Sequence, residues 1–191
     1  MEDNLYAPPS ANLIADPAAA GTGRFYVVAP FKFCLLFFFT LGLYQLYWFY
    51  MQWARYSRRH PQQTVWPVAR AIFAVFFAHA LANRLDEAGR ERGERSDWGP
   101  VATATAYVVA QILGNVSDQL AARNIGLPYS DLIGTAMLVP IGLSLLRMQA
   151  AANRASGDPQ GDGNRRLGPA NYVWLAIGVV LWLALLSSYV L

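Results

Sequence analysis

Polar side chains that could line a path for a solute or an ion are concentrated between residues 99 and 121. Residues three or four apart in a helix share one face, and the spacing here places a set of polar residues on one such face. These residues are Thr103, Tyr107, Gln111, Asn115 and Asp118. Ionisable groups at membrane depth are costly and normally face other helices, so we predict that this face lies away from lipid.

Three polar residues from other apolar stretches are expected at the depth of Asp118. Gln45 ends the first stretch, Arg70 lies near the start of the second, and Asp131 begins the fourth. Together they predict an intramembrane polar cluster in which Arg70 pairs with Asp118 or Asp131. The predicted cluster consists of Gln45, Arg70, Gln111, Asn115, Asp118 and Asp131. It could form a vestibule, or it could lock the helices in register as interhelical polar contacts do.

The sequence carries weak signals for metal binding or catalysis. His60 and His79 are the only histidines, and they are predicted on opposite sides of the membrane, whereas a metal site needs several convergent ligands. The loop over residues 156–166 contains Asp158 and Asp162, but their spacing departs from the EF-hand pattern, so a tight Asx turn is expected. No serine lies in a GxSxG elbow. We predict no cofactor, no metal and no enzymatic activity.

Long apolar stretches must position these residues. Residues 30–50, PFKFCLLFFFTLGLYQLYWFY, contain one charge and are long enough for a helix to cross a bilayer core of about 30 Å. The chain is 55% hydrophobic and 14% charged, against about 25% charged in soluble domains. The predicted spans cover residues 30–50, 66–85, 99–121, 129–146 and 169–191. The predicted fold class is therefore all-α, a polytopic membrane helix bundle with about five transmembrane helices.

Two regions are expected along the chain. Residues 1–24 are rich in proline, alanine and glycine and show no helical or strand period, which predicts a flexible tail without a cleavable signal peptide. Residues 25–191 form the transmembrane helical domain. Within it, Pro140 should kink its helix because proline removes a backbone donor. Cys34 is the only cysteine, which excludes a disulfide within the chain.

The placement of arginine predicts the orientation. Cytoplasmic loops are enriched in Lys and Arg, and five spans would put most basic residues on the side of the N-terminus, which we therefore place in the cytoplasm. Arg55, Arg58 and Arg59 oppose this assignment, and a first stretch that re-entered the membrane would leave the two sides balanced. The net charge of +3 is small and the arginines lie in separate loops, so nucleic acid is not an expected partner.

Four blocks of the sequence resemble a known group of proteins. They are YVVAPFKF at residues 26–33, TLGLYQLYWFY at 40–50, WPVARAIFAVFF at 66–77 and NRASGDPQGDGN at 153–164. Similar blocks, in the same order, occur in uncharacterised multi-pass proteins of proteobacterial inner membranes. The resemblance implies a multi-pass protein of the bacterial inner membrane. It implies no particular activity, substrate or catalytic residue.

Three classes of function compete. The first is a non-enzymatic accessory, protein-interaction or toxin-immunity protein, whose partners are the lipid bilayer, other membrane proteins or a second copy of the chain. The second is a small solute or ion transporter or channel subunit, favoured by the polar face over 99–121. The third is a membrane enzyme acting on lipid, for which the candidate carboxylates are Asp86, Glu87, Asp158 and Asp162. We predict the first class.

Overall fold

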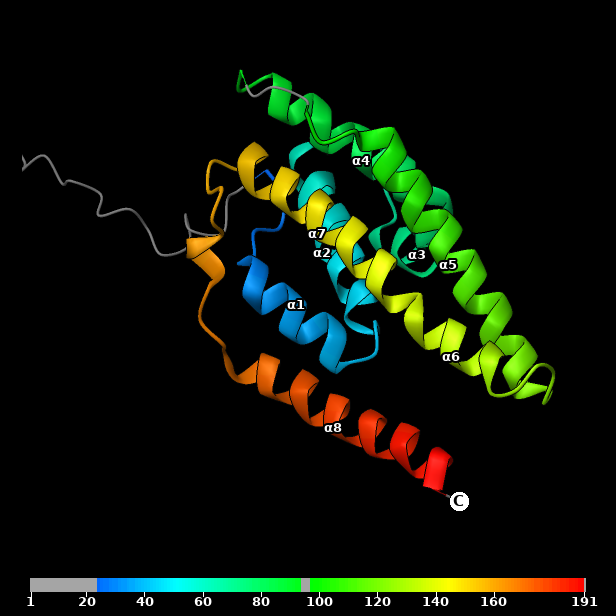
Figure 1. The fold of residues 1–191 in the computed structure, drawn as a ribbon. Helices are drawn as coiled ribbons and strands as arrows, with labels where there is room; N and C mark the ends of the chain where they lie inside the picture. The colour runs from blue at the N-terminus through cyan, green and yellow to red at the C-terminus, as the bar shows by residue number, and fades with distance from the viewer. Residues whose placement is uncertain (1–23, 94–96, 191) are drawn as a thin grey trace, which may run out of the picture.

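The computed structural model describes residues 24–93 and 97–190, so the tail predicted over residues 1–24 lies almost entirely outside it. The described residues are all-helical, as the sequence predicts (Figure 1). The α-helices are α1 (Pro30–Phe39), α2 (Tyr44–Arg59), α3 (Pro67–Ile72), α4 (Ala74–Arg90), α5 (Pro100–Ala122), α6 (Tyr129–Ala136), α7 (Leu138–Ala155) and α8 (Pro169–Val190). A short 3-10 helix, η2, covers Asp162–Asn164.

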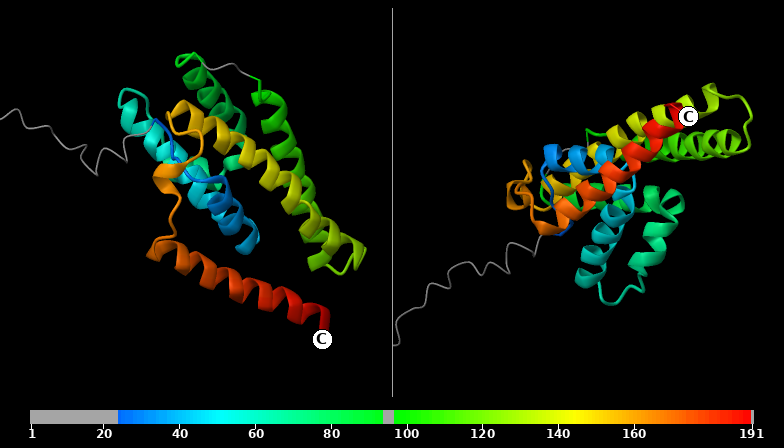
Figure 2. Two further views of the ribbon diagram at one scale, coloured as in Figure 1. Left: turned by 60° about the vertical axis from the view of Figure 1, so that its left-hand side comes forward. Right: turned by 90° about the horizontal axis from the view of Figure 1, so that it is seen from below.

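The stretch over residues 30–50, predicted as one helix, is instead two helices joined by a turn. Leu41 and Gly42 have left-handed backbones, with φ angles of 49° and 84°, and glycine adopts this conformation without the usual steric cost. Thr40 stabilises the turn because its hydroxyl accepts the Tyr44 N–H at 3.0 Å. With 10 residues, α1 extends about 15 Å, half of a bilayer core. In the right-hand view of Figure 2, α2 and α3 project away from α1 and α7.

The other predicted stretches agree with the structure to different degrees. The stretches over 99–121 and 169–191 are the single helices α5 and α8. The stretch over 66–85 is divided at Phe73 between α3 and α4. The stretch over 129–146 continues to Ala155 and is interrupted only at Met137. This interruption lies three residues before Pro140, which has no backbone N–H to complete the helical bonding there.

One continuous helix among the described residues, Tyr129–Ala155, is long and apolar enough to cross a membrane. Only 33% of its most apolar window is buried within the protein, so most of that window faces outward. Two other helical segments, Pro30–Phe39 and Pro169–Leu185, are apolar but shorter. The predicted bundle of about five spans is therefore supported for one span, and the remaining spans stay predictions.

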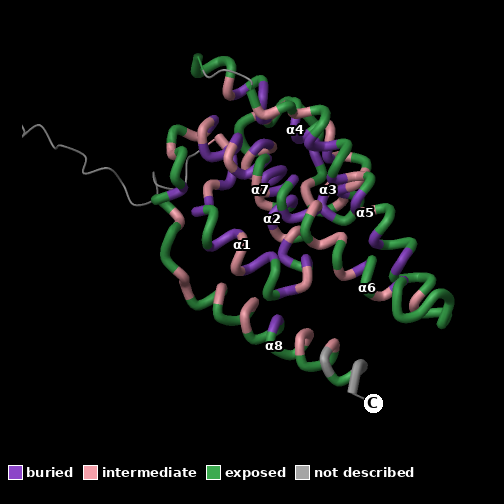
Figure 3. Tube along the Cα trace, viewed as in Figure 1, coloured by how far each residue is buried: buried purple, intermediate pink, exposed green. Residues whose placement is uncertain are grey.

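The core lies where α1, α2, α4 and α7 meet, whereas α8 and the lower parts of α5 and α6 are mostly exposed (Figure 3). Trp48 and Trp53 of α2 are both fully buried in this core. Two glycines allow close helix approach, as small residues do between membrane helices. A Cβ at Gly142 of α7 would lie 2.9 Å from the ring of Phe37, and a Cβ at Gly178 of α8 would lie 2.4 Å from the Phe39 carbonyl oxygen.

At one end of the protein α1 and α8 begin and α4 and α7 end (Figure 1), and the segments around these helix ends are rich in basic residues. We call this the basic end. It consists of Arg24, Lys32, Arg55, Arg58, Arg59, Arg84, Arg90, Arg92, Arg147, Arg154, Arg165 and Arg166. Some of these charges are paired locally, as in the 2.7 Å contact between Arg90 and Asp86. Arg123 lies at the opposite end, where α5 leads into α6.

Candidate functional site

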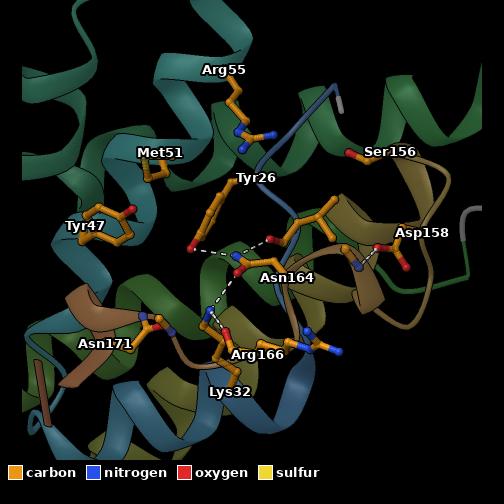
Figure 4. A pocket seen from close by; sticks show the side chains of 13 residues that line it. Tyr26, Lys32, Tyr47, Met51, Arg55, Ser156, Asp158, Asn164, Arg166 and Asn171 are labelled. Atoms are coloured by element: carbon orange, nitrogen blue, oxygen red, sulfur yellow. Dashed lines mark hydrogen bonds between the residues drawn. The ribbon is translucent and has the colours of Figure 1, made fainter. Parts of the chain in front are cut away.

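A pocket of about 640 Å³ opens at the basic end, between α1, α2, the loop after α7 and the start of α8 (Figure 4). Charged and hydrogen-bonding side chains dominate its lining. They are Lys32, Arg55, Asp158 and Arg166, together with Tyr26, Tyr47, Asn164 and Asn171. The pocket therefore combines three cationic groups with one carboxylate, which gives it a positive balance.

Lys32 is the least exposed of these charges, with 4% of its surface accessible. Its Nζ donates to Asn164 Oδ1 at 2.7 Å and to the Arg166 carbonyl oxygen at 2.8 Å, and Figure 4 shows this ammonium pointing up beneath Asn164. Among the described residues, no carboxylate forms an ion pair with it. Burial lowers the pKa of the Lys32 ammonium below its usual value. An ammonium has three donors, so one remains for a ligand.

The walls of the pocket are fixed by bonds to the backbone. Asn164 Nδ2 donates to the Tyr26 hydroxyl at 3.1 Å and to the Val27 carbonyl oxygen at 2.9 Å. The Arg55 guanidinium lies 5.6 Å from the centroid of the Tyr26 ring. Both oxygens of Asp158 accept backbone N–H groups of η2, at 3.0 and 2.8 Å. The carboxylate thus organises the turn, as an Asx turn does.

The start of α8 closes the other side of the pocket. Asn171 Oδ1 accepts the Gly168 N–H at 2.9 Å, so its amide N–H groups stay available. The N-terminus of a helix carries a partial positive charge from its unpaired N–H groups, and α8, with 22 residues, begins here. Trp174 packs edge-on against Tyr44, with ring centroids 6.0 Å apart. This contact holds the first turns of α8 against α2.

Behind the pocket, residues 25–29 run as an extended segment whose backbone is bonded by buried side chains. Gln52 accepts the Tyr26 N–H at 3.0 Å and donates to its carbonyl oxygen at 3.1 Å. Asn153 makes the same paired contact with Val28, at 3.2 and 3.0 Å. Gln149 donates to the Tyr26 carbonyl oxygen at 3.0 Å and accepts a bond from the Trp48 indole. The three amide side chains are fully buried, so they hold this segment rigidly.

The predicted pairing of Arg70 with Asp118 or Asp131 is wrong. The Arg70 guanidinium lies over aromatic rings, 4.2 Å from the centroid of Trp53 and 5.1 Å from that of Phe77. The break at Phe73 separates α3 from α4, and α3 packs mainly against α2. Arg70 is thus a packing residue between α2 and α4.

The other predicted cluster residues are only partly brought together. Gln45 accepts a hydrogen bond from the Tyr107 hydroxyl at 3.1 Å. Asp118 and Asn115 are exposed, and Asp131 is close enough to Asp118 to act on it electrostatically. Gln111 has a buried side-chain oxygen with no hydrogen-bond partner among the described residues. The structure therefore places Asp118 near Asp131, and the rest of the predicted cluster stays a prediction.

The pocket is not among the sites predicted from the sequence, although one residue of the sequence points to it. Lys32 is the only lysine and lies inside an apolar stretch, where a charge normally has a functional role. The histidines lie apart: His79 bonds Thr105 at 3.0 Å, and His60 bonds the Tyr56 carbonyl oxygen at 3.0 Å. Within the part of the chain that the structure describes, no group of three His, Cys, Asp or Glu side chains could hold a metal ion.

No protein-family model, curated protein or solved structure matches this chain. The class of ligand is therefore inferred from the side chains that line the pocket. Ammonium, guanidinium and amide groups are among its lining side chains, and its carboxylate is already engaged by backbone N–H groups. Such a site is suited to an anion with several acceptor oxygens.

Proposed function

We propose that the protein is a non-enzymatic, multi-pass protein of the bacterial inner membrane that acts by binding lipids or other membrane proteins. The observation that carries this proposal is the outward-facing apolar surface of the 129–155 helix, where Leu132, Val139 and Leu143 are each more than half exposed. Soluble monomers rarely expose contiguous apolar patches of more than a few hundred Å². The inner-membrane assignment is supported by the resemblance of the four sequence blocks.

We assign three membrane crossings to this protein. The 129–155 helix is one, and α5 and α8, with 23 and 22 residues, extend about 33 to 35 Å, enough for a core of about 30 Å. Exposed apolar side chains on both helices favour contact with lipid, among them Val109 of α5 and Val180 of α8. The α1–α2 pair enters from the basic end and turns back at Leu41 and Gly42.

The proposed orientation has the basic end in the cytoplasm, because cytoplasmic segments are enriched in Lys and Arg. The turn between α1 and α2 strengthens this assignment. It brings Arg55, near the end of α2, back to the Tyr26 ring. Arg55, Arg58 and Arg59 then lie at the basic end and support the proposed orientation. If the first stretch crossed the membrane as one helix, the same three arginines would oppose it. The N-terminal side is then cytoplasmic, and α8 ends on the opposite side.

Binding, as opposed to catalysis, is favoured by how the pocket groups are held. Lys32 and Asn164 are bonded to the backbone, and the Asp158 carboxylate is engaged by two N–H groups. Groups fixed in this way present a constant surface to a ligand. A general base, in contrast, must reach and accept a proton.

Extraction and thiol labelling test the membrane proposal. Alkaline carbonate should leave the protein in the membrane pellet. In a Cys34→Ala background, Ile125→Cys reports on the α5–α6 connection and Gln160→Cys on the loop at the basic end, and both side chains are exposed. A membrane-impermeant maleimide should label Ile125→Cys in intact spheroplasts and label Gln160→Cys only after permeabilisation. The reverse pattern would invert the orientation, and release by carbonate would refute membrane integration.

Transport is the second candidate, favoured by one observation. The side-chain oxygen of Gln111 is buried midway along α5 without a partner in the described structure, as expected of a group that contacts water or a solute. Flux in proteoliposomes that is lost in Gln111→Leu protein, at unchanged protein content, would favour transport over binding.

A further inference from the structure

We propose that the pocket at the basic end binds the phosphate group of an anionic membrane lipid, with Lys32 and Arg166 as its principal contacts. The inference rests on the proposed membrane location and names the ligand class for that function. It is carried by the charge of the pocket, by its unused donors and by exposed apolar residues close in sequence to its lining.

The charge argument begins with Lys32. A buried charge costs free energy unless it is paired, yet this ammonium, with 4% exposure, has only neutral oxygens as partners. Arg55 and Arg166 add positive charge to the same lining, and the one carboxylate, Asp158, faces the backbone of η2. An anion in the pocket supplies the missing counter-charge.

The donor argument concerns what lies around that ammonium. Lys32 keeps one N–H, and the side-chain amide of Asn171 keeps its two, because its oxygen accepts the Gly168 N–H. The Arg166 guanidinium makes no hydrogen bond or ion pair within the described residues. A phosphate group offers only acceptor oxygens and binds guanidinium and ammonium groups with charge-assisted bonds. The acceptor oxygens of a phosphate group therefore complement the unused donors of Lys32, Asn171 and Arg166.

Position favours a lipid over a free ion. The pocket lies at the end of the 129–155 helix, lined in part by Ser156, so it lies at the depth of the phosphate layer when that helix crosses the membrane. Apolar side chains close in sequence to the lining residues Lys32 and Asn171 are exposed: Phe31 of α1 by 76% and Val173 of α8 by 61%. They can contact acyl chains while the headgroup occupies the pocket. A volume of about 640 Å³ is within the range of about 300 to 1,000 Å³ typical of small-molecule sites.

The test measures binding to the full chain purified in a neutral detergent. The probes are short-chain phosphatidylglycerol, short-chain phosphatidylcholine and inorganic phosphate. The dissociation constant of each probe is measured by isothermal titration calorimetry. We expect phosphatidylglycerol to bind more tightly than either of the others, because it combines a net negative charge with acyl chains. The variants Lys32→Gln and Arg166→Gln should each weaken its binding about tenfold or more, as expected for loss of a charged hydrogen bond.

Arg165→Gln is the matched control, because it removes the same charge one residue away. Arg165 lies 3.7 Å from Asp162 and is not part of the pocket lining, so its loss should change affinity less than about twofold, the range of surface charges. Equal losses in Arg165→Gln and Arg166→Gln would reduce the effect to diffuse attraction and overturn the proposal. If Lys32→Gln fails to fold, Arg166→Gln carries the test, because its side chain holds no structural bond.

The remaining outcomes separate the ligand sources. Inorganic phosphate binding as tightly as phosphatidylglycerol would assign the pocket to a free anion, and equal binding of phosphatidylcholine would remove the role of net charge. Either result overturns the lipid assignment. Carbonate extraction tests the membrane location independently of lipid binding. A protein that stays in the pellet but binds no phosphatidylglycerol therefore refutes this inference and leaves the proposed membrane function standing.

Discussion

The 25–29 segment and the α5–α6 pair both contain buried polar groups, but their hydrogen bonding differs. Around the 25–29 segment, the buried amides of Gln52, Gln149 and Asn153 bond the backbone in both directions. In the α5–α6 pair, the buried oxygen of Gln111 has no partner in the described structure, and the exposed Asp118 lies near a second carboxylate.

This difference shows that polar content alone does not identify the side chains that stabilise the fold. A buried hydrogen bond contributes only about 1 kcal/mol on balance, whereas a buried group left without a partner costs roughly 1 to 3 kcal/mol. The buried amides around the 25–29 segment therefore stabilise the protein, whereas the buried oxygen of Gln111 lowers its stability. The same substitution, glutamine to leucine, should have opposite effects in the two places.

The largest effect is expected from Gln149→Leu. This change removes the acceptor of the Trp48 indole and one donor to the Tyr26 carbonyl oxygen, and both partners are buried. We expect the free energy of unfolding to fall by on the order of 3 kcal/mol. Denaturant titration in detergent, followed by tryptophan fluorescence, measures it.

Gln160→Leu is the control for that variant. Gln160 is exposed in the loop after α7, so its replacement should change the free energy of unfolding by less than about 0.5 kcal/mol. Equal destabilisation by Gln149→Leu and Gln160→Leu would show that the buried network contributes nothing specific.

An intermediate effect is expected from Gly178→Ala. The added Cβ would meet the backbone of Phe39 at 2.4 Å, and backbone atoms can separate only if α8 moves away from α1. We expect a loss of about 1 to 3 kcal/mol, as for overpacked cores. Thermal unfolding monitored by circular dichroism in detergent measures it.

Gly134→Ala supplies the comparison from the other region. Its Cβ would meet the Asp118 carboxylate oxygen at 2.0 Å, which an exposed side chain can relieve by rotating. Alanine is also a better helix former than glycine by about 1 kcal/mol. Gly134→Ala should therefore be neutral or mildly stabilising, and a loss as large as that of Gly178→Ala would contradict the contrast between a rigid and an adaptable contact.

Apart from the control variants, the smallest effect is expected from Gln111→Leu, and its sign is opposite. Replacing a buried oxygen that lacks a partner with an apolar group should raise the free energy of unfolding by about 1 kcal/mol. The measurement is the same denaturant titration as for Gln149→Leu. A decrease in stability would mean that the Gln111 oxygen bonds water inside the protein.

The positions of α5 and α8 could be predicted from the sequence, because each is a single apolar stretch bounded by Gly or Pro. The break between α1 and α2 could not be predicted, although the sequence contains a glycine there, Gly42. Hydropathy over a window detects how apolar a stretch is, and Leu41 in a left-handed conformation changes the direction of the chain without changing its hydropathy. The predicted helix over 30–50 failed for that reason.

The predicted pairing of Arg70 with an aspartate failed for a related reason. It assumed straight helices that cross the membrane at matching depths, whereas the break at Phe73 places Arg70 over Trp53. The network around the 25–29 segment could not be inferred, because it satisfies backbone groups of an extended segment. Nothing in a helical wheel indicates that Gln149 and Asn153 bond the main chain.

The turn at Leu41 and Gly42 also bears on how the chain is inserted during synthesis. Because α1 and α2 return to the side they came from, the proposed topology leaves the ends of the described helices before α5 on the ribosome's side of the bilayer. Translocation then involves only the short connection from α5 to α6 and the end of α8. In this proposed topology Arg123 is the one basic residue of the described chain in the exported parts, so biogenesis would not move the other described arginines across lipid.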